Sequence, residues 1–282
     1  MRDSPAVGSE FKLVTDRLSK SFQQRNTEVR AVADISLSIR EGEFVSVVGA
    51  SGCGKTTLLR MLDGLLRPTS GSIVIDGRPV VGPGTSSVAF VFQQDRLLPW
   101  RGVERNTLIG PEIQRRQTGA VRTLANSLID LVGLSGFEKH YPHELSGGMR
   151  QRVNLARALA IDPEILLMDE PFASLDAQTR EIMQTELLRI WSETKKTVLF
   201  VTHQIDEAVF LSDRVFVLTV RPGRVKEEIT IDLPRPRELA VKRSVEFAHY
   251  TDRIWRLIEQ EVRDGIGLEA QQAAALRARG AQ

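Results

Sequence analysis

The sequence has a single cysteine, Cys53, among its 282 residues, so the chain cannot form a disulfide within itself. It also lacks long apolar runs, since purely apolar stretches such as 165–168 and 198–201 fall far short of the ~18 residues that a membrane-spanning helix needs. No apolar segment followed by a small-residue cleavage site marks the N-terminal residues as a secretory signal. We therefore expect a chain that does not cross a membrane by itself and that works in a reducing compartment, the cytosol.

Neither sign of charge is in large excess. Lys and Arg total 38 and Asp and Glu total 36, which gives a formal net charge of +2. An excess this small exerts no long-range attraction on a polyanion, so we expect no nucleic acid partner. Hydrophobic residues make up 41% and charged residues 26% of the chain, which is typical of a globular protein and excludes a disordered or fibrous one.

Short β-rich runs alternate with helical stretches along the chain, a pattern that predicts an α/β domain with a largely parallel sheet. The predicted strands are 11–14, 35–39, 44–48, 72–75, 88–92, 165–168, 197–201 and 215–220. Between about Asp95 and Ala160 the strand signal stops, and the spacing predicts helices over 121–131 and 149–160. This segment is predicted to be a helical insertion into the α/β sheet.

One apolar stripe runs along the predicted helix 149–160. The arginines of this helix are then left to solvent or to a partner: Arg150, Arg152 and Arg157. A solvated surface is the simpler interpretation, and a face near anionic lipid headgroups is the alternative. After Ile231, two prolines break any strand, and apolar residues at helical spacing over 247–262 predict a helical tail that packs on the body.

Residues 49–56, with the sequence GASGCGKT, fit the pattern G-x-x-x-x-G-K-[ST] between a β-like run and a helix-like segment. Glycines allow successive backbone N–H groups to point at phosphate oxygens, and the N-terminal end of the helix adds positive potential. Lys55 is predicted to neutralise the β- and γ-phosphates, and Thr56 to give its hydroxyl to Mg²⁺. A glycine-rich turn without a ligand is the alternative. The predicted phosphate-binding residues are Gly49, Ala50, Ser51, Gly52, Cys53, Gly54, Lys55, Thr56 and Thr57.

Cys53 lies inside this loop, beside Lys55 and near the start of the helix. A helix N-terminus and a neighbouring cation favour a thiolate, so we expect a bulky maleimide to react here and to block nucleotide binding. The alternative is that the cysteine only fills a place that requires a small residue.

The apolar run 165–168 ends in two carboxylates, Asp169 and Glu170, as expected where a buried parallel strand opens on a ligand crevice. Asp169 is predicted to hold Mg²⁺, directly or through water. Glu170 is predicted to polarise the water that attacks the γ-phosphate. A solvated pair of carboxylates at a strand end is the alternative.

Residues 145–149, with the sequence LSGGM, directly precede the predicted helix 149–160. Ser146 is a plausible N-cap, and Gly147 and Gly148 let backbone N–H groups approach an anion, so this is a second phosphate-binding loop without a lysine. One nucleotide has one γ-phosphate, which the first loop already binds from one side. A second copy of the chain is therefore expected to supply this loop from the opposite side.

Together these motifs resemble those of ABC transporter ATP-binding subunits, over about residues 12–225. The loop 49–57 resembles the Walker A motif, 165–170 resembles Walker B, and 145–149 resembles the LSGGQ signature with methionine in place of the usual glutamine. The resemblance implies a D-loop at 174–176. It also implies roles for single residues: Gln93 of the Q-loop as a ligand of Mg²⁺ and of the attacking water, with Gln94 as the rival, His203 as the switch histidine, and Phe22 as the ring that stacks on adenine.

The resemblance implies an α/β fold with a P-loop NTPase core, an antiparallel β subdomain and a helical subdomain insertion. The implied nucleotide-binding domain spans 1–232, with the helical subdomain at about 95–160, and 233–282 form a C-terminal helical tail. The implied cofactors are ATP and Mg²⁺. The implied partners are two transmembrane permease subunits, a second ATP-binding subunit and, indirectly, a periplasmic or extracellular substrate-binding protein. The chain would then be a peripheral subunit at the cytoplasmic face of the inner or plasma membrane.

Within that family, three phrases resemble importers of nitrate, sulfonates and taurine: 90–100, 221–224 and 232–237. Related importers of other small organic anions and of pyrimidine precursors are similar and remain alternatives. The implied function is that of an ATP hydrolase that drives the uptake of a small organic or inorganic anion through a separate permease. One alternative is a soluble ABC-type ATPase of translation or repair, but those normally have two cassettes in one chain or a long coiled coil. Another is a non-hydrolysing regulator, which would lack Glu170 or His203.

Overall fold

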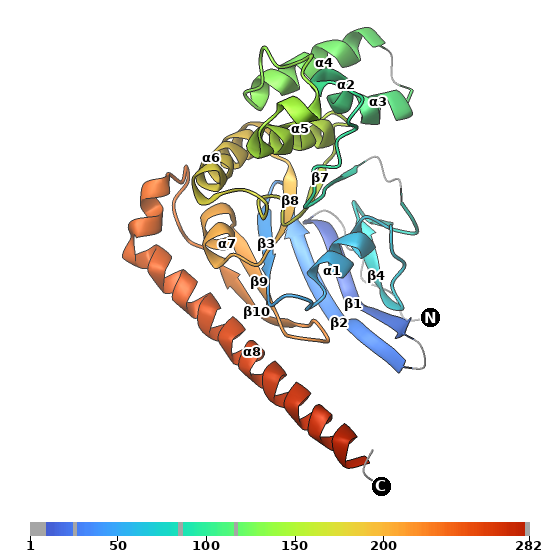
Figure 1. Ribbon diagram of the computed structural model, residues 1–282, viewed down its shortest axis with the longest axis vertical. Coiled ribbons are helices and arrows are strands. Elements are labelled where there is room, and N and C mark those ends of the chain that lie inside the picture. The colour runs from blue at the N-terminus through green and yellow to red at the C-terminus, as the bar shows by residue number, and fades with distance from the viewer. Residues whose placement is uncertain (1–9, 25–26, 84–86, 116–117, 280–282) are drawn as a thin grey trace.

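A computed structural model describes residues 10–24, 27–83, 87–115 and 118–279 of the chain (Figure 1). Six strands form a mixed sheet in the order β10-β9-β3-β8-β7-β6, in which every neighbouring pair is parallel except β10 and β9. Its strands are β3 (Phe44–Val48), β6 (Val88–Val91), β7 (Ile165–Asp169), β8 (Thr197–Thr202), β9 (Arg214–Leu218) and β10 (Val225–Thr230). The predicted parallel sheet is therefore confirmed.

A second sheet is antiparallel and has the order β2-β1-β4-β5. Its strands are β1 (Phe11–Gln24), β2 (Thr27–Arg40), β4 (Ser70–Ile75) and β5 (Arg78–Pro79). Strands β1 and β2 form a hairpin much longer than the two short strands predicted at 11–14 and 35–39. The extension was missed because most of its residues are polar or charged and give no apolar alternation.

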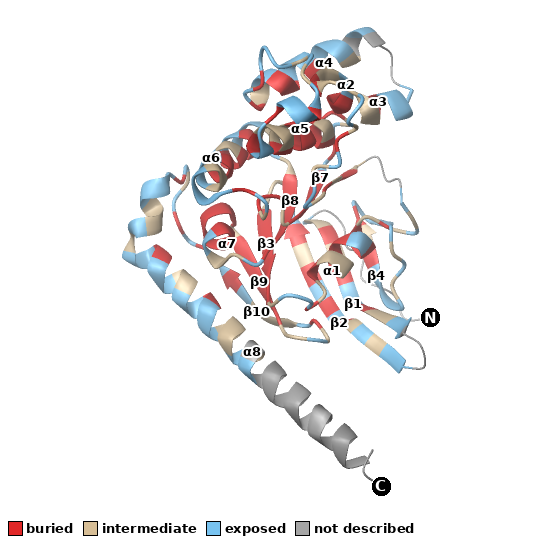
Figure 2. Ribbon diagram, in the orientation of Figure 1, coloured by how far each residue is buried: buried red, intermediate tan, exposed pale blue. Residues whose placement is uncertain are grey.

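The central strands β3, β7, β8 and β9 are buried along their whole length (Figure 2). One face of the six-stranded sheet packs on helices, and the other packs on the helix 55–62 and the second sheet, so continuous apolar runs replace the alternation of a half-exposed strand. Strand β10, of sequence VKEEIT, was not predicted, because a partly exposed edge strand can carry charges. The run expected at 215–220 ends at Leu218, where Thr219 begins a turn by donating its backbone N–H to Arg224.

Helix α1 (Lys55–Leu62) follows β3, and α6 (Ala177–Thr194) and α7 (Ile205–Leu211) lie on either side of β8 in the chain. Between β6 and β7 the described residues form only helices and loops, and these helices gather at one end of the molecule (Figure 1). They are α2 (Val103–Thr107), α3 (Ile109–Ile113), α4 (Thr118–Leu131), the 3₁₀ turn η1 (Pro142–Glu144) and α5 (Gly147–Leu159).

The arginines of α5 are only partly exposed, and each one hydrogen-bonds within the chain, so the expectation that they are left to solvent or a partner was only partly met. Arg150 Nε lies 2.9 Å from Asp95 Oδ2, and Arg157 donates to the backbone carbonyl of Asp95 at 2.7 Å. Arg152 donates to the carbonyl of Val132 at 3.2 Å. Helical periodicity indicates which face is apolar, but it cannot show that loops from elsewhere in the chain cover the polar face.

The tail contains the 3₁₀ turn η2 (Leu239–Arg243) and the long helix α8 (Val245–Arg279). Phe247 and Ile254 are buried in the main core cluster, so the first turns of α8 pack on the body as predicted. The rest of the helix runs diagonally away from the sheets (Figure 1). No helix in the described part of the chain is both long enough and apolar enough to span a bilayer.

Candidate functional site

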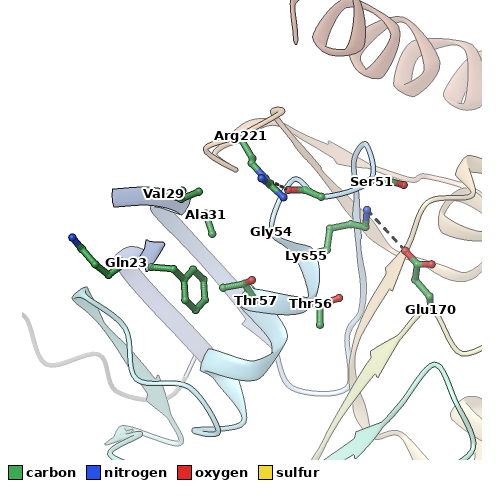
Figure 3. Close-up of a pocket in the computed structure, with 12 residues that line it drawn as sticks. Gln23, Val29, Ala31, Ser51, Gly54, Lys55, Thr56, Thr57, Glu170 and Arg221 are labelled. Carbon is green, nitrogen blue, oxygen red and sulfur yellow. Dashed lines mark hydrogen bonds and ion pairs between the residues drawn. The ribbon is translucent and has the colours of Figure 1, made fainter. Parts of the chain in front are cut away.

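A cleft of about 470 Å³ opens beside the N-terminus of α1; we call it the main cleft (Figure 3). It brings together the loop after β3, the residue after β7, the β1–β2 hairpin and the turn between β9 and β10. Its lining residues are Phe22, Gln23, Val29, Ala31, Ser51, Gly52, Gly54, Lys55, Thr56, Thr57, Glu170 and Arg221. This position at the carboxyl ends of parallel strands is where α/β sheets bind ligands.

The loop between β3 and α1 has a shape that only glycine allows at Gly54. The φ angle there is +104°, and a Cβ would lie 2.8 Å from the backbone oxygen of Ala31 and 2.9 Å from a methyl group of Val32. Other residues rarely adopt this conformation, and here the neighbouring backbone also fills the space. A tight turn therefore connects β3 to α1, and its backbone N–H groups lie near the N-terminus of α1, as in phosphate-binding loops.

Lys55 places its ammonium group against this loop. Its Nζ donates to the carbonyl oxygens of Gly49 at 2.8 Å and Ala50 at 3.2 Å, and it lies 4.0 Å from Oε1 of Glu170. The side chain is only 5% exposed. A buried cation with its charge directed into the cleft, next to a helix N-terminus, is suited to an anionic ligand such as phosphate.

Thr56 and Asp169 form a pair of oxygen donors beside the main cleft. The Thr56 hydroxyl donates to Oδ1 of Asp169 at 3.0 Å. Burial raises the pKa of the Asp169 carboxyl, and the Thr56 hydrogen bond opposes that shift. A hydroxyl and a carboxylate fit a hard cation such as Mg²⁺, which would take its other ligands from phosphate oxygens and water.

Glu170 and His203 lie within hydrogen-bonding distance, at 2.9 Å between Oε2 and Nδ1. Glu170 has a φ of +45°, and its backbone N–H donates to the carbonyl of Val201 at 2.8 Å. Positive φ is uncommon for a residue other than glycine and is often retained at functional sites. Here it turns the chain at the end of β7, and the Glu170 carboxylate lines the cleft.

A polar network lies close to His203 in the chain and joins the last residue of β8 to side chains of α6 and α7. Glu207 is 3% exposed and accepts hydrogen bonds from the hydroxyl of Thr202 at 2.6 Å and the amide of Gln184 at 3.2 Å, with Arg180 at 3.6 Å. Burial raises the pKa of Glu207, and these three neighbours oppose the shift. Arg180 also donates to the carbonyl of Leu175 at 2.7 Å. The network therefore joins the predicted D-loop to the end of β8, which His203 directly follows. Sequence reasoning missed it, because its members share no spacing.

Gln93 and the loop 145–149 lie outside the main cleft. A second cleft of about 620 Å³ is lined by Gln93, its rival Gln94 and Gly147, together with Ser174 of the predicted D-loop. Ser146 caps α5, because its Oγ accepts the backbone N–H of Met149 at 3.2 Å. Within one chain, therefore, Gln93 and Gly147 of the loop 145–149 line one cleft, and residues of the loop 49–57 line another.

Two single-residue expectations have different outcomes. Phe22 lines the main cleft, is 40% exposed as a residue and has Lys20 Nζ 5.4 Å from its ring centroid, so it is available to a ligand. Cys53 is fully buried, and burial raises its pKa even though Lys55 opposes the shift. The expected thiolate was therefore wrong, because desolvation of the thiol outweighs the nearby cation. Of the lining residues, sequence reasoning missed Gln23, Val29, Ala31 and Arg221 as parts of the site.

Comparison with known proteins decides which family this geometry belongs to. Residues 32–173 match the family model described as ABC transporter. The chain belongs to the ABC transporter family. An uncharacterized ABC transporter ATP-binding protein of Methanocaldococcus jannaschii is 53% identical over 253 residues, which cover 90% of this chain and 93% of that protein.

Other relatives from this family carry the names of importers. The nitrate import ATP-binding protein of Synechocystis sp. is 45% identical over 251 residues, covering 87% of this chain and 94% of that protein. The aliphatic sulfonates import ATP-binding protein of Bacillus licheniformis is 47% identical over 218 residues, covering 77% of this chain and 84% of that protein. The predicted resemblance to this group of ABC subunits is confirmed.

Among solved structures, the dimeric post-hydrolysis state of the ATP-binding cassette MJ0796 bound to ADP and Pi superposes with a TM-score of 0.69. It is 32% identical and covers 79% of this chain and all of that one. The predicted P-loop ABC ATPase fold, with its antiparallel subdomain and helical insertion, is therefore confirmed.

Proposed function

We propose that this chain is the ATP-hydrolysing motor subunit of an ABC importer that takes up a small organic or inorganic anion of the nitrate, sulfonate or taurine type. The observation that carries the proposal is the position of Glu170 between Lys55 of the glycine loop, at 4.0 Å, and His203, at 2.9 Å. The names of the relatives support the importer part of the proposal.

The residues present fit a magnesium nucleotide. The cleft has a glycine turn that a Cβ would fill, a buried ammonium group and a hydroxyl–carboxylate pair. Mg²⁺ bound to ATP would neutralise charge on the phosphate oxygens, and Thr56 and Asp169 would hold it, with Gln93 as a further ligand. Phe22 would stack on the adenine.

The roles of the charged side chains follow from their distances. Glu170 accepts a proton from water and so generates the nucleophile, while the hydrogen bond to His203 fixes the orientation of its carboxylate. Lys55 lies beside the same carboxylate, where it can stabilise negative charge on the phosphates. His203 is itself half exposed, and it directly follows Thr202, whose hydroxyl donates to Glu207.

The separation of the two clefts suggests how the site is completed. Ser146, Gly147 and Gly148 form a capped helix N-terminus that lies away from the main cleft of the same chain. We propose that a second copy of the chain contributes this loop to the nucleotide, so that two copies enclose two ATP molecules. Two transmembrane permease subunits would bind the pair at the cytoplasmic face of the membrane, and a substrate-binding protein would deliver the anion from the other side.

We assign 1–232 to the nucleotide-binding domain, with the helical subdomain at about 95–160, and 233–282 to a C-terminal helical tail. The helices α2–α5 lie between β6 and β7, and η2 and α8 follow the last strand, which supports these limits.

Affinity purification of the tagged chain from detergent-solubilised membranes of its source organism tests the proposal. We expect the permease subunits to copurify and the complex to hydrolyse Mg-ATP. In liposomes, one anion among nitrate, an alkanesulfonate and taurine, added with its binding protein, should stimulate hydrolysis, and the Lys55→Ala complex should not respond. A chain that hydrolyses ATP but sediments free of any membrane protein would instead be a soluble ABC-type ATPase.

A further inference from the structure

The turn between β9 and β10 brings an arginine to the rim of the main cleft. Arg221 follows the end of β9, lines the cleft, and is exposed to solvent. In Figure 3 its guanidinium lies over the loop that carries Ser51 and Gly54. Apart from Lys55, it is the only cation among the residues that line this cleft in the described part of the chain.

The position of this turn relative to the glycine loop is fixed by backbone contacts. Gly223 donates its N–H to the carbonyl of Ala31 at 2.9 Å, and its own carbonyl accepts the N–H of Ala33 at 2.9 Å. A Cβ at Gly223 would lie 2.1 Å from the carbonyl oxygen of Cys53. The turn therefore packs directly on the loop, and these main-chain contacts hold the backbone of Arg221 near the cleft.

The Arg221 guanidinium uses only part of its hydrogen-bonding capacity. Its Nε donates to the carbonyl oxygen of Gly52 at 3.0 Å, and Nη2 would lie 3.3 Å from a Cβ built on Gly52. The two terminal nitrogens make no hydrogen bond to any residue that the structure describes. Guanidinium has five N–H donors in a planar fork that matches phosphate oxygens, so most of its donors are available to a ligand.

The tail helix supports the same turn from behind. Glu261 on α8 accepts the backbone N–H of Val220 at 3.1 Å and pairs with Lys226 of β10 at 2.7 Å. Val220 directly precedes Arg221. The position of the arginine thus depends on contacts to both the glycine loop and the C-terminal helix.

We propose that Arg221 is a nucleotide-binding residue: its terminal nitrogens donate to a phosphate oxygen of bound ATP while its Nε remains on Gly52. The proposal rests on the proposed function, since it needs ATP in the main cleft. The Arg221 side chain contacts the loop 49–57 and does not lie beside Glu170 and His203. It therefore binds the nucleotide with the same strength in the ground state and in the transition state of hydrolysis. Such uniform binding lowers KM without raising kcat.

The test compares three variants of the full chain by ATP titration and by steady-state hydrolysis. Arg221→Met keeps the apolar stem but loses the charge and the fork, and Arg221→Lys keeps the charge alone. Arg224→Met is the matched control: Arg224 lies in the same turn, pairs with Asp34 at 3.3 Å, and does not line the cleft.

For Arg221→Met we expect the Kd and KM for ATP to rise about tenfold with kcat within about twofold of the parent, as for loss of one charge-assisted phosphate contact. Arg221→Lys should recover part of the affinity, and Arg224→Met should match the parent. Added salt should weaken ATP binding less steeply in Arg221→Met than in the parent, because one screened interaction is gone.

Either of two results would overturn the inference. One is a KM for Arg221→Met within about twofold of the parent. The other is a lower Tm and a lower kcat with unchanged Kd, which would mean that the arginine only supports the loop. If the parent chain itself fails to bind ATP, the proposed function fails instead, so the two failures are distinguishable.

Discussion

The imidazole of His203 lies 2.9 Å from the carboxylate of Glu170, across the ends of the neighbouring parallel strands β7 and β8. The other oxygen of that carboxylate lies 4.0 Å from the ammonium group of Lys55, on the loop that follows β3. Because β3 is the next strand of the same sheet, three consecutive strands each contribute one charged or titratable group to a single point. The chemistry of the site follows from this convergence.

Replacing Glu170 with glutamine should stop hydrolysis without stopping ATP binding. Glutamine keeps the size and the hydrogen bond to His203 but cannot take a proton from water, so phosphate release should fall by at least about 10²-fold. The Kd for ATP should stay within about threefold. Glu164→Gln, at the exposed opposite end of the same strand segment, is the control and should hydrolyse at the parental rate. Unchanged phosphate release by Glu170→Gln would show that this carboxylate is not the base.

Gly54→Ala should lose both stability and nucleotide binding. The new Cβ would meet the Ala31 carbonyl at 2.8 Å in a backbone with φ of +104°. Urea unfolding should show that the free energy of unfolding falls by about 2–4 kcal/mol, because the strained backbone and the overpacking both destabilise the fold. Gly77→Ala is the matched control, because Gly77 has φ of +70° but no atom within 4 Å of a Cβ, and it should lose only about 1 kcal/mol. Equal losses in the two variants would mean that the contact with Ala31 does not matter.

Asp63, at the end of α1, should make the stability depend on pH. Burial raises its pKa to about 6, whereas an unfolded aspartate titrates near 3.9. The folded chain therefore holds the proton more tightly, and the contribution of Asp63 to stability falls as the pH rises from about 4 to about 6 and stays low above that. Asp63→Asn should be more stable than the parent at pH 8 by about 1–2 kcal/mol, a figure reduced for the partial exposure of the side chain. This difference in the free energy of unfolding should shrink as the pH falls to 4.5. A difference that does not change with pH would show that the titration of Asp63 is not its cause.

Cys53 should react slowly in the folded chain. Its full burial and raised pKa predict maleimide labelling about 100-fold slower, or slower still, than in denaturant, because the thiolate is the reactive species. Stopped labelling followed by mass spectrometry measures both rates. Rapid labelling of the native chain would restore the sequence-based expectation of a reactive thiol.

The parts of the site that the sequence predicts are those whose residues are adjacent in the chain. The glycine loop, the two carboxylates after β7 and the Ser146 cap each follow from local spacing and backbone chemistry. Arg221 and Glu207 could not be placed in this way, because Arg221 bonds to Gly52 and Glu207 to Gln184, and only the fold brings these segments together. Cys53 was misjudged for a related reason: its sequence neighbours are a cation and a helix start, but its side chain is fully buried in a hydrophobic core cluster.

The proposed mechanism requires two copies of the chain to share each nucleotide. Each copy supplies the loop 145–149, which the main cleft of the other copy lacks. Sedimentation equilibrium of the Glu170→Gln chain tests this directly. Without nucleotide we expect single subunits. With saturating Mg-ATP we expect a dimer, and the same chain carrying Lys55→Ala should remain single. Single subunits at every loading concentration of the Glu170→Gln chain with Mg-ATP would contradict the account.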